Sequence, residues 1–155
     1  MTTQSSASAC VPPFDHRIVD TIGALVANIV AQNNGVVISP RQGGPHAVFG
    51  TPWMYEWAKI GEYMDRLKEW IVCDPESFVV ATCLIKRLEA HQAIPPLTQR
   101  TAHRVFLTAL LLAVKMLEDE TLTNSDFAKV GCVTTKQLNR SEDTRLNSSH
   151  RTISY

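Results

Sequence analysis

The chain has 155 residues, of which 45% are hydrophobic, and its 15 basic residues balance 15 acidic ones. This length predicts one domain with tails, and the composition is too apolar for a disordered chain. Zero net charge gives no electrostatic basis for binding nucleic acid or an anionic membrane. We therefore expect a globular domain whose partner is neither a nucleic acid nor a membrane.

The cysteines are scattered along the chain, and no two of them have the C-x-x-C spacing of a zinc site. They are Cys10, Cys73, Cys83 and Cys132. Single thiols are typical of a reducing compartment, so we expect an intracellular protein, in the nucleus or the cytoplasm. The opening residues MTTQSSASAC lack the basic and apolar regions of a secretory signal.

The first half of the chain alternates between helical patterns and turn residues. Residues 1–15 are rich in Ser, Thr, Ala and Pro and predict a disordered tail, whereas 16–32 carry one apolar stripe at helical spacing. Glycines and prolines predict a long loop over 33–52. A second helix is expected over 53–72. A third helix should run from Pro75, after Asp74 as N-cap, to about residue 91.

The stretch HRVFLTALLLAVKMLED, from His103 to Asp119, is apolar on nearly every face. Leu, Ala and Met favour a helix, and a helix that is apolar all round must be covered all round. The run is too short to cross a bilayer, which needs roughly 20 apolar residues. It therefore predicts the central helix of a small all-α domain. Lys115, near its end, lies either at the rim or where a partner binds.

Two start signals follow the central helix. Asn124 is expected to cap a short helix that stops at Gly131. Thr134 and Gln137 then form a T-x-x-Q capping box, with Val133 and Leu138 placed as a hydrophobic staple.

The helix that this capping box predicts loses its apolar pattern after one turn. Its inward positions are expected near 141, 142 and 145, where the chain has Ser141, Glu142 and Arg145. The segment SEDTRLNSSHRTISY resembles the translation of a sequencing adapter, which occurs at the ends of proteins derived from transcript assemblies. We therefore expect 16–140 to be the domain, cut off within this helix, and 141–155 to be an artefactual or disordered tail.

No catalytic constellation is present in the sequence. The five histidines form neither H-x-x-x-H nor H-E-x-x-H, and the G-x-S-x-G, Walker and G-x-G-x-x-G patterns do not occur. We therefore expect no metal, no cofactor, no small-molecule substrate and no enzymatic activity. Lys68 and its basic neighbours Arg66 and Arg87 are interleaved with acidic residues and predict a solvated face.

Four segments in order resemble one family. IGEYMDRLKEWIVCDPESFVVATCLIKRL, from Ile60, is similar to the first two helices of a cyclin box. TAHRVFLTALLLAVKMLEDE, from Thr101, resembles its third helix, which ends in A-x-K. TNSDFAKVGCVTTKQLN, from Thr123, resembles the T-N-x-x-Y-A-K-V-G-G-I segment of P/U-type cyclins, the group that contains phosphate-signalling cyclins. The helix over 16–32 fits the helix that precedes the box in this group.

The resemblance implies a cyclin-like helical bundle and a partner-binding site. Lys115 matches the lysine of the cyclin signature, which would donate hydrogen bonds to backbone carbonyls beside the C-helix of a cyclin-dependent protein kinase. Leu112 and Met116 correspond to apolar contacts with that helix, although core packing explains Leu112 nearly as well. Glu142 falls, by spacing, at the family's second polar contact, yet it lies in the adapter-like tail.

Two positions depart from the family pattern. Lys86 stands where cyclins usually have an aspartate that pairs with the arginine matched here by Arg66, so the usual ion pair is expected to be absent. Cys132 replaces the second glycine of K-V-G-G, and a cysteine is strained there if the position needs a positive φ.

The function implied by the resemblance is regulatory. The chain would bind a cyclin-dependent kinase and hold its C-helix in the active position, in cell-cycle or phosphate signalling. The alternatives are a cyclin-fold scaffold that does not activate a kinase, which Lys86 favours, and a non-functional truncated product.

Overall fold

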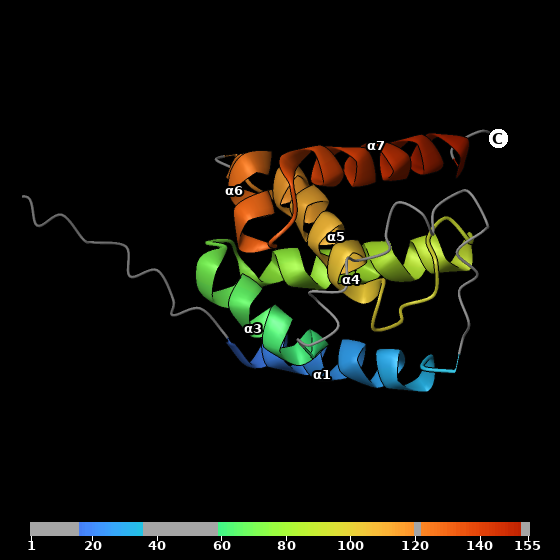
Figure 1. The fold of residues 1–155 in the computed structure, drawn as a ribbon. Coiled ribbons are helices and arrows are strands. Elements are labelled where there is room, and N and C mark those ends of the chain that lie inside the picture. Colours follow the sequence, from blue (N-terminus) through green and yellow to red (C-terminus); the bar gives the residue numbers. More distant parts are fainter. Residues whose placement is uncertain (1–15, 36–58, 120–121, 153–155) are drawn as a thin grey trace, which may run out of the picture.

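The computed structural model describes residues 16–35, 59–119 and 122–152, and these residues form helices and no strand. The helices are α1 (His16–Gln32), α3 (Ile60–Trp70), α4 (Pro75–Ala90), α5 (Ala102–Leu117), α6 (Asn124–Val130) and α7 (Thr135–Thr152). Figure 1 shows α1 and α7 at opposite edges of the bundle, with α3, α4 and α5 between them. The predicted all-α class is confirmed.

Helix α5 is the centre of this bundle. All of its residues from Ala102 to Leu111 are buried, and α4, α7, α3 and α6 all contact it. Its polar residues are accommodated inside the core. The ring of His103 packs edge-on against Tyr63, with centroids 4.8 Å apart, and the Thr108 hydroxyl donates to the carbonyl of Arg104 at 2.7 Å. A helix that is apolar all round is thus covered along most of its length.

The helix boundaries largely follow the sequence patterns. α1 has the expected bounds, and α4 begins at Pro75 directly after Asp74. α3 begins at Ile60, and residues 53–58 of the expected second helix lie outside the described residues. The predicted tail at 1–15 and most of the predicted loop, 36–52, also lie outside them. Among the described helices, none combines the length and apolar content needed to cross a membrane.

The N-cap of α6 differs from the prediction. Thr123, not Asn124, is the capping residue: its hydroxyl accepts from the backbone N–H of Asp126 at 3.3 Å. The Asp126 carboxylate accepts in return from the backbone N–H of Thr123, also at 3.3 Å. This T-x-x-D arrangement satisfies two N–H groups at the helix start. The Asn124 side chain is thereby left to bind elsewhere.

Helix α7 starts as predicted but does not stop as predicted. The Thr134 N–H donates to Gln137 Oε1 at 3.0 Å, and the Gln137 N–H donates to Thr134 Oγ1 at 3.1 Å, so the capping box is confirmed. The helix continues to Thr152. A disordered tail is therefore wrong for residues 141–152, and their adapter-like origin stays a prediction.

One buried polar residue shows how α7 continues past its apolar turn. Ser141 is fully buried at an inward position, and its hydroxyl donates to the carbonyl of Gln137 at 3.0 Å. A serine can occupy an apolar contact surface when its hydroxyl is satisfied by its own helix. Leu138, one turn earlier, is fully buried and belongs to the core.

The turn between α6 and α7 is a Schellman motif. The Val133 N–H donates to the carbonyl of Ala128 at 2.9 Å, and the Cys132 N–H donates to that of Lys129 at 3.2 Å. This motif places its C′ residue in the left-handed region, and Cys132 has a φ of 52°. The sequence expectation of a strained cysteine is therefore confirmed.

Replacing Cys132 with glycine should stabilise the protein by about 0.5–1 kcal/mol, because glycine adopts a positive φ without steric cost. Gln92, with a φ of 54° at the end of α4, provides the matched site. Gln92→Gly should stabilise in the same direction, whereas Cys132→Val should destabilise. Urea unfolding measures all three variants, and a Cys132→Gly variant less stable than the parent would contradict this account.

Gly131 is required for a different reason, which is the close approach of α6 to α5. A Cβ atom at this position would overlap the side-chain methyl groups of Leu107. Gly131→Ala should therefore destabilise the protein by about 1–3 kcal/mol. The control is Gly61→Ala, since a Cβ on Gly61 of α3 has no neighbour within 4 Å. Equal thermal melting of the two variants would show that the approach of the helices is not tight.

Candidate functional site

The predicted partner-binding residues lie where α5 emerges from the bundle. Leu112 is half-buried, and Lys115 is exposed over 37% of its side chain. Met116 is 68% exposed, although it follows a buried stretch of the same helix. The end of α5 therefore presents a cation and a large apolar side chain on neighbouring positions.

Lys115 and Glu142 are in direct contact. Lys115 Nζ lies 2.7 Å from Glu142 Oε1, and the Glu142 side chain is only 13% exposed. The other carboxylate oxygen of Glu142 accepts from Asn124 Nδ2 at 2.8 Å. The same Asn124 group donates to Asn139 Oδ1 at 2.7 Å. These bonds join the end of α5 to the starts of α6 and α7.

Asn124 is a residue whose role sequence reasoning assigned wrongly. An asparagine at a helix start is usually a cap, but here Thr123 caps α6 and Asn124 positions Glu142. The signal that could have revealed this is the overlap of two caps, because T-N-S-D already contains a complete T-x-x-D capping box.

Glu118 is a positioning residue that the sequence analysis did not identify. Its Oε1 accepts from the backbone N–H of Asp74 at 3.1 Å and from the hydroxyl of Ser77 at 3.0 Å. The Asp74 side chain makes no capping hydrogen bond. The Glu118 carboxylate, at the end of α5, instead accepts a hydrogen bond from a backbone N–H group at the start of α4. This contact fixes the end of α5, on which Lys115 and Met116 lie.

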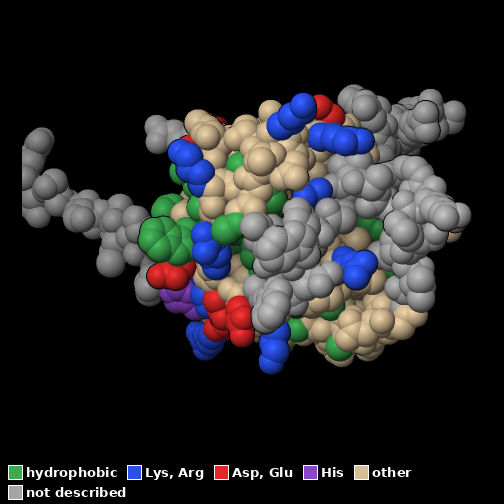
Figure 2. Space-filling view, in the orientation of Figure 1, with side chains coloured by type: hydrophobic (Ala, Val, Ile, Leu, Met, Phe, Trp, Pro, Cys, Tyr) green, Lys and Arg blue, Asp and Glu red, His purple; other side chains and the backbone are tan. Residues whose placement is uncertain are grey.

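The surroundings of this site are apolar rather than ionic. Leu117 is 47% exposed beside Met116, while Trp70 and Val72, in the turn that leads to Asp74, are 62% and 86% exposed. Figure 2 shows hydrophobic side chains gathered where α3 turns into α4. Within the described residues, no three His, Cys, Asp or Glu side chains form a group that could hold a metal ion. Exposed apolar side chains around a cation and a carboxylate suit a protein partner.

Arg66 has an acceptor other than the missing aspartate. Its Nε donates to the backbone carbonyl of Val130 at 2.8 Å. Val130 is the last residue of α6, where backbone carbonyls lack helical partners and carry partial negative charge. A helix end thus takes the place of the carboxylate expected from the family pattern. Burial has the largest effect on Glu89 and raises its pKa. Lys86, which stands at the aspartate's position, lies close enough to Glu89 to offset part of this rise.

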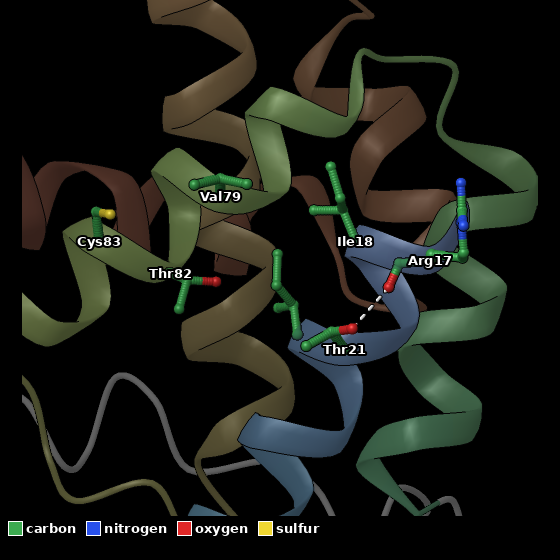
Figure 3. Close-up of a pocket in the computed structure, with 7 residues that line it drawn as sticks. Arg17, Ile18, Thr21, Val79, Thr82 and Cys83 are labelled. Carbon is green, nitrogen blue, oxygen red and sulfur yellow. Dashed lines mark hydrogen bonds between the residues drawn. The ribbon is translucent and has the colours of Figure 1, made fainter. Parts of the chain in front are cut away.

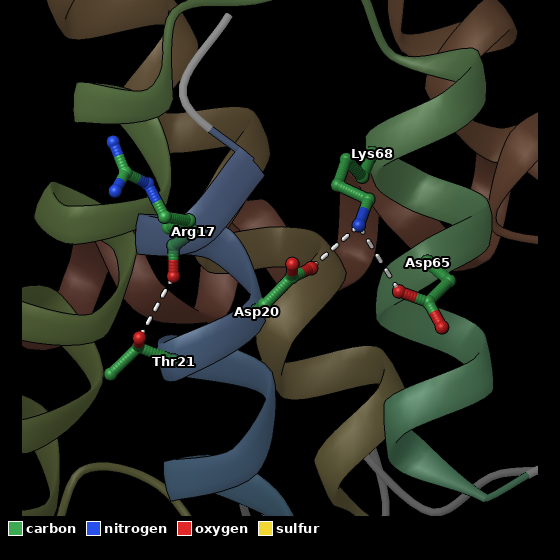
Figure 4. A network of polar contacts seen from close by, with 5 residues as sticks. All are labelled: Arg17, Asp20, Thr21, Asp65 and Lys68. Carbon is green, nitrogen blue, oxygen red and sulfur yellow. Dashed lines mark hydrogen bonds and ion pairs between the residues drawn. The ribbon is translucent and has the colours of Figure 1, made fainter.

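The basic residues predicted to form a solvated face differ in exposure: Arg66 and Arg87 are exposed, whereas Lys68 is largely covered. Its side chain is 18% exposed, and its Nζ lies 2.6 Å from Asp20 Oδ1 on α1 and 3.4 Å from Asp65 Oδ1 on α3 (Figure 4). The hydrogen bond that Lys68 donates to Asp20 has the largest influence on the pKa of Lys68 and raises it. This ion pair ties α1 to α3, so α1 is an integral part of the bundle.

Comparison with known proteins identifies the family. The family model described as Cyclin matches residues 15–146. The chain belongs to the cyclin family. The match includes α1 and extends past Arg140, into the segment that resembles an adapter.

The similar cyclins are of the U and P types. Cyclin-U3-1 of Arabidopsis thaliana is 36% identical over 83 residues, which are 54% of this chain and 37% of that protein. Cyclin-P1-1 of Oryza sativa subsp. japonica is 28% identical over 133 residues, 80% of this chain and 50% of that protein. Cyclin-U1-1 of Arabidopsis thaliana is 25% identical over 139 residues, 90% of this chain and 64% of that protein. The chain therefore spans less than two thirds of each relative, and it is a cyclin of the P/U type.

The Lys115–Glu142 ion pair should hold α7 against α5 in this cyclin. Glu142→Gln removes the charge and should destabilise the protein by about 0.5–1 kcal/mol, with faster amide exchange in α7. This loss of stability should be smaller at high salt, because salt screens a partly exposed ion pair. Asp143→Asn, at the exposed neighbouring position, is the control. If both variants melt alike, the pair contributes nothing to the docking of α7.

Proposed function

We propose that this cyclin binds a cyclin-dependent protein kinase and stabilises the active conformation of the kinase by docking on its C-helix. The observation that carries the proposal is the position of Lys115, paired with Glu142 and flanked by the exposed Met116 at the end of a buried helix. This arrangement offers a partner helix a donor, Lys115, and an apolar contact, Met116, on neighbouring positions of α5. Membership of the cyclin family supports the kinase as partner.

The chemistry of Lys115 fits a contact with backbone carbonyls. An ammonium group has three donors, so Lys115 can keep its bond to Glu142 and still donate to a carbonyl of the partner. Glu142, held by Asn124, keeps the lysine in one position before the partner arrives. A donor that is already positioned loses less conformational entropy on binding.

The physical mechanism is a shift of population in the kinase. A regulator that binds the active arrangement of the C-helix more tightly than the inactive one increases the active fraction by that difference in affinity. The kinase supplies ATP, magnesium and every catalytic group. This cyclin would act as a regulatory subunit rather than as an enzyme, inside the cell, in cell-cycle control or phosphate signalling.

The second candidate function is a cyclin-fold scaffold that binds a partner without activating a kinase. The observation that favours it is the replaced ion pair, because Arg66 binds the carbonyl of Val130 and Lys86 occupies the place of the usual aspartate. A changed internal contact between the first two box helices would alter the surface that they present. Binding and activation must therefore be measured separately.

Lys115→Glu should weaken kinase binding at least about tenfold, because it places a like charge beside Glu142 and removes the donor. The measurement is pulldown of a panel of cyclin-dependent kinases with the full chain, followed by phosphorylation of histone H1 by the captured kinase. Lys136→Glu, an exposed lysine at the start of α7, is the matched control.

Three outcomes separate the candidates. Capture and activation that depend on Lys115 support the regulatory subunit. Capture without activation favours the scaffold. Equal capture by the Lys115→Glu variant and the parent would show that the end of α5 is not the kinase-binding site.

A further inference from the structure

A second surface of the molecule lies away from the end of α5. A groove of about 340 Å³ runs between α1 and α4, and Figure 3 shows the side chains of the two helices on either side of it. Its apolar lining is formed by Ile18, Thr21 and Ile22 of α1 and by Val79, Thr82 and Cys83 of α4. α1 lies at the edge of the bundle opposite α7, so this groove is separate from the Lys115–Glu142 pair (Figure 1).

The two threonines of the groove have hydroxyl groups that already donate hydrogen bonds. The Thr21 hydroxyl donates to the carbonyl of Arg17 at 2.8 Å, and the Thr82 hydroxyl donates to that of Phe78 at 2.9 Å. Each hydroxyl is thus satisfied by its own helix. The lining therefore has few groups that a polar ligand could bind, and it suits an apolar side chain.

Two large hydrophobic side chains of the groove remain exposed, and a third lies farther along α1. Ile18 is 42% exposed and Val79 is 41% exposed, on opposite walls. Leu25, 41% exposed, follows Ile18 by seven residues and therefore lies on the same side of α1. A group of exposed apolar side chains indicates a binding surface, whereas single exposed apolar side chains do not.

The charges at the groove have a preferred sign. Arg17 lines one end, and Lys86 continues the row of Val79 and Cys83 by helical spacing toward the other end. Among the nearby carboxylates, Asp20 is bound by Lys68, and Glu89 beside Lys86 accepts from the backbone of Leu97. Glu76 precedes Val79 by one turn, so its negative charge offsets positive charge only near the start of α4. A basic side chain therefore lies toward each end of the groove, Arg17 at the start of α1 and Lys86 farther along α4.

We propose that the groove between α1 and α4 is a docking site for a short peptide segment of a partner protein, with leucine-like side chains flanked by acidic residues. The apolar residues of the segment fill the space between Ile18 and Val79, and a carboxylate binds Lys86. Two helices with an apolar groove between them commonly take a helical peptide with anchors three or four residues apart. The basic residue that departs from the family pattern, Lys86, thus selects an acidic partner.

The test uses a fluorescein-labelled peptide of twelve residues, with two leucines four positions apart and glutamates on both sides. Fluorescence polarisation with the full chain should give saturable binding, and the same peptide with lysines in place of the glutamates should bind at least about tenfold more weakly. Val79→Glu and Lys86→Glu should each weaken binding of the acidic peptide about tenfold. Lys136→Glu, at an exposed position of α7 outside the groove, should leave it unchanged.

Thiol labelling gives a second readout without substitution. The acidic peptide should slow maleimide labelling of Cys83, which lines the groove, and leave Cys132, which is exposed elsewhere, unchanged. Cys73 should stay unlabelled in both samples, because burial raises its pKa to about 12. Mass spectrometry resolves the sites.

Several results would overturn the proposal. Equal binding of the acidic and basic peptides, or equal loss with Lys136→Glu, would show that the groove does not select an acidic apolar segment. Slow labelling of Cys83 in the free chain at every concentration would show that the chain covers its own groove. Labelling that slows as the protein concentration rises would assign the groove to a second copy of the chain.

Discussion

The rest of the structure depends on the burial of α5. A helix with apolar side chains on every face cannot be stable in water, so other helices must surround it. In this bundle α4, α3, α6 and α7 do so, and even His103 and Arg104 are almost fully buried. Two small residues at helix contacts follow from this need. Gly131 lets α6 approach Leu107, and Ser141 lets α7 lie on the core.

The same constraint explains where the proposed binding surface lies. Most of α5 is buried as far as Val114, and its last three residues, from Lys115 to Leu117, are exposed. Glu118 anchors this end to the start of α4, and Glu142 anchors Lys115 from the other side. A rigid end of a buried helix, with its cation already oriented, is a suitable platform for another protein.

Most helices of the fold were predictable from the sequence, because each of them carries a strong local sequence pattern. Hydrophobic periodicity predicted α1 and α4, a run that is apolar on nearly every face predicted α5, and the T-x-x-Q box predicted the start of α7. The positive φ at Cys132 followed from the glycine that the family pattern has there. What could not be predicted depends on contacts between distant residues. Neither the acceptor for Arg66 at the end of α6 nor the role of Glu118 at the start of α4 leaves a local pattern.

The prediction for residues 141–152 failed for a physical reason. The apolar pattern stops after one turn, but the capping box, the buried Leu138 and the Glu142–Lys115 pair support α7 through its first turns. Polar residues do not prevent a helix from continuing once it is nucleated, because each further residue adds a hydrogen bond. Composition indicates whether a segment packs into a core better than it indicates whether the segment is helical.

The most direct test of the central claim is hydrogen–deuterium exchange of the full chain, with and without a captured cyclin-dependent kinase. If this cyclin docks on the kinase through the end of α5, slower exchange should appear around Leu112–Met116 and at the start of α7. Exchange in α1 should be unchanged. Slower exchange confined to α1 and α4, with none at the end of α5, would contradict the account and place the kinase on the opposite edge of the bundle.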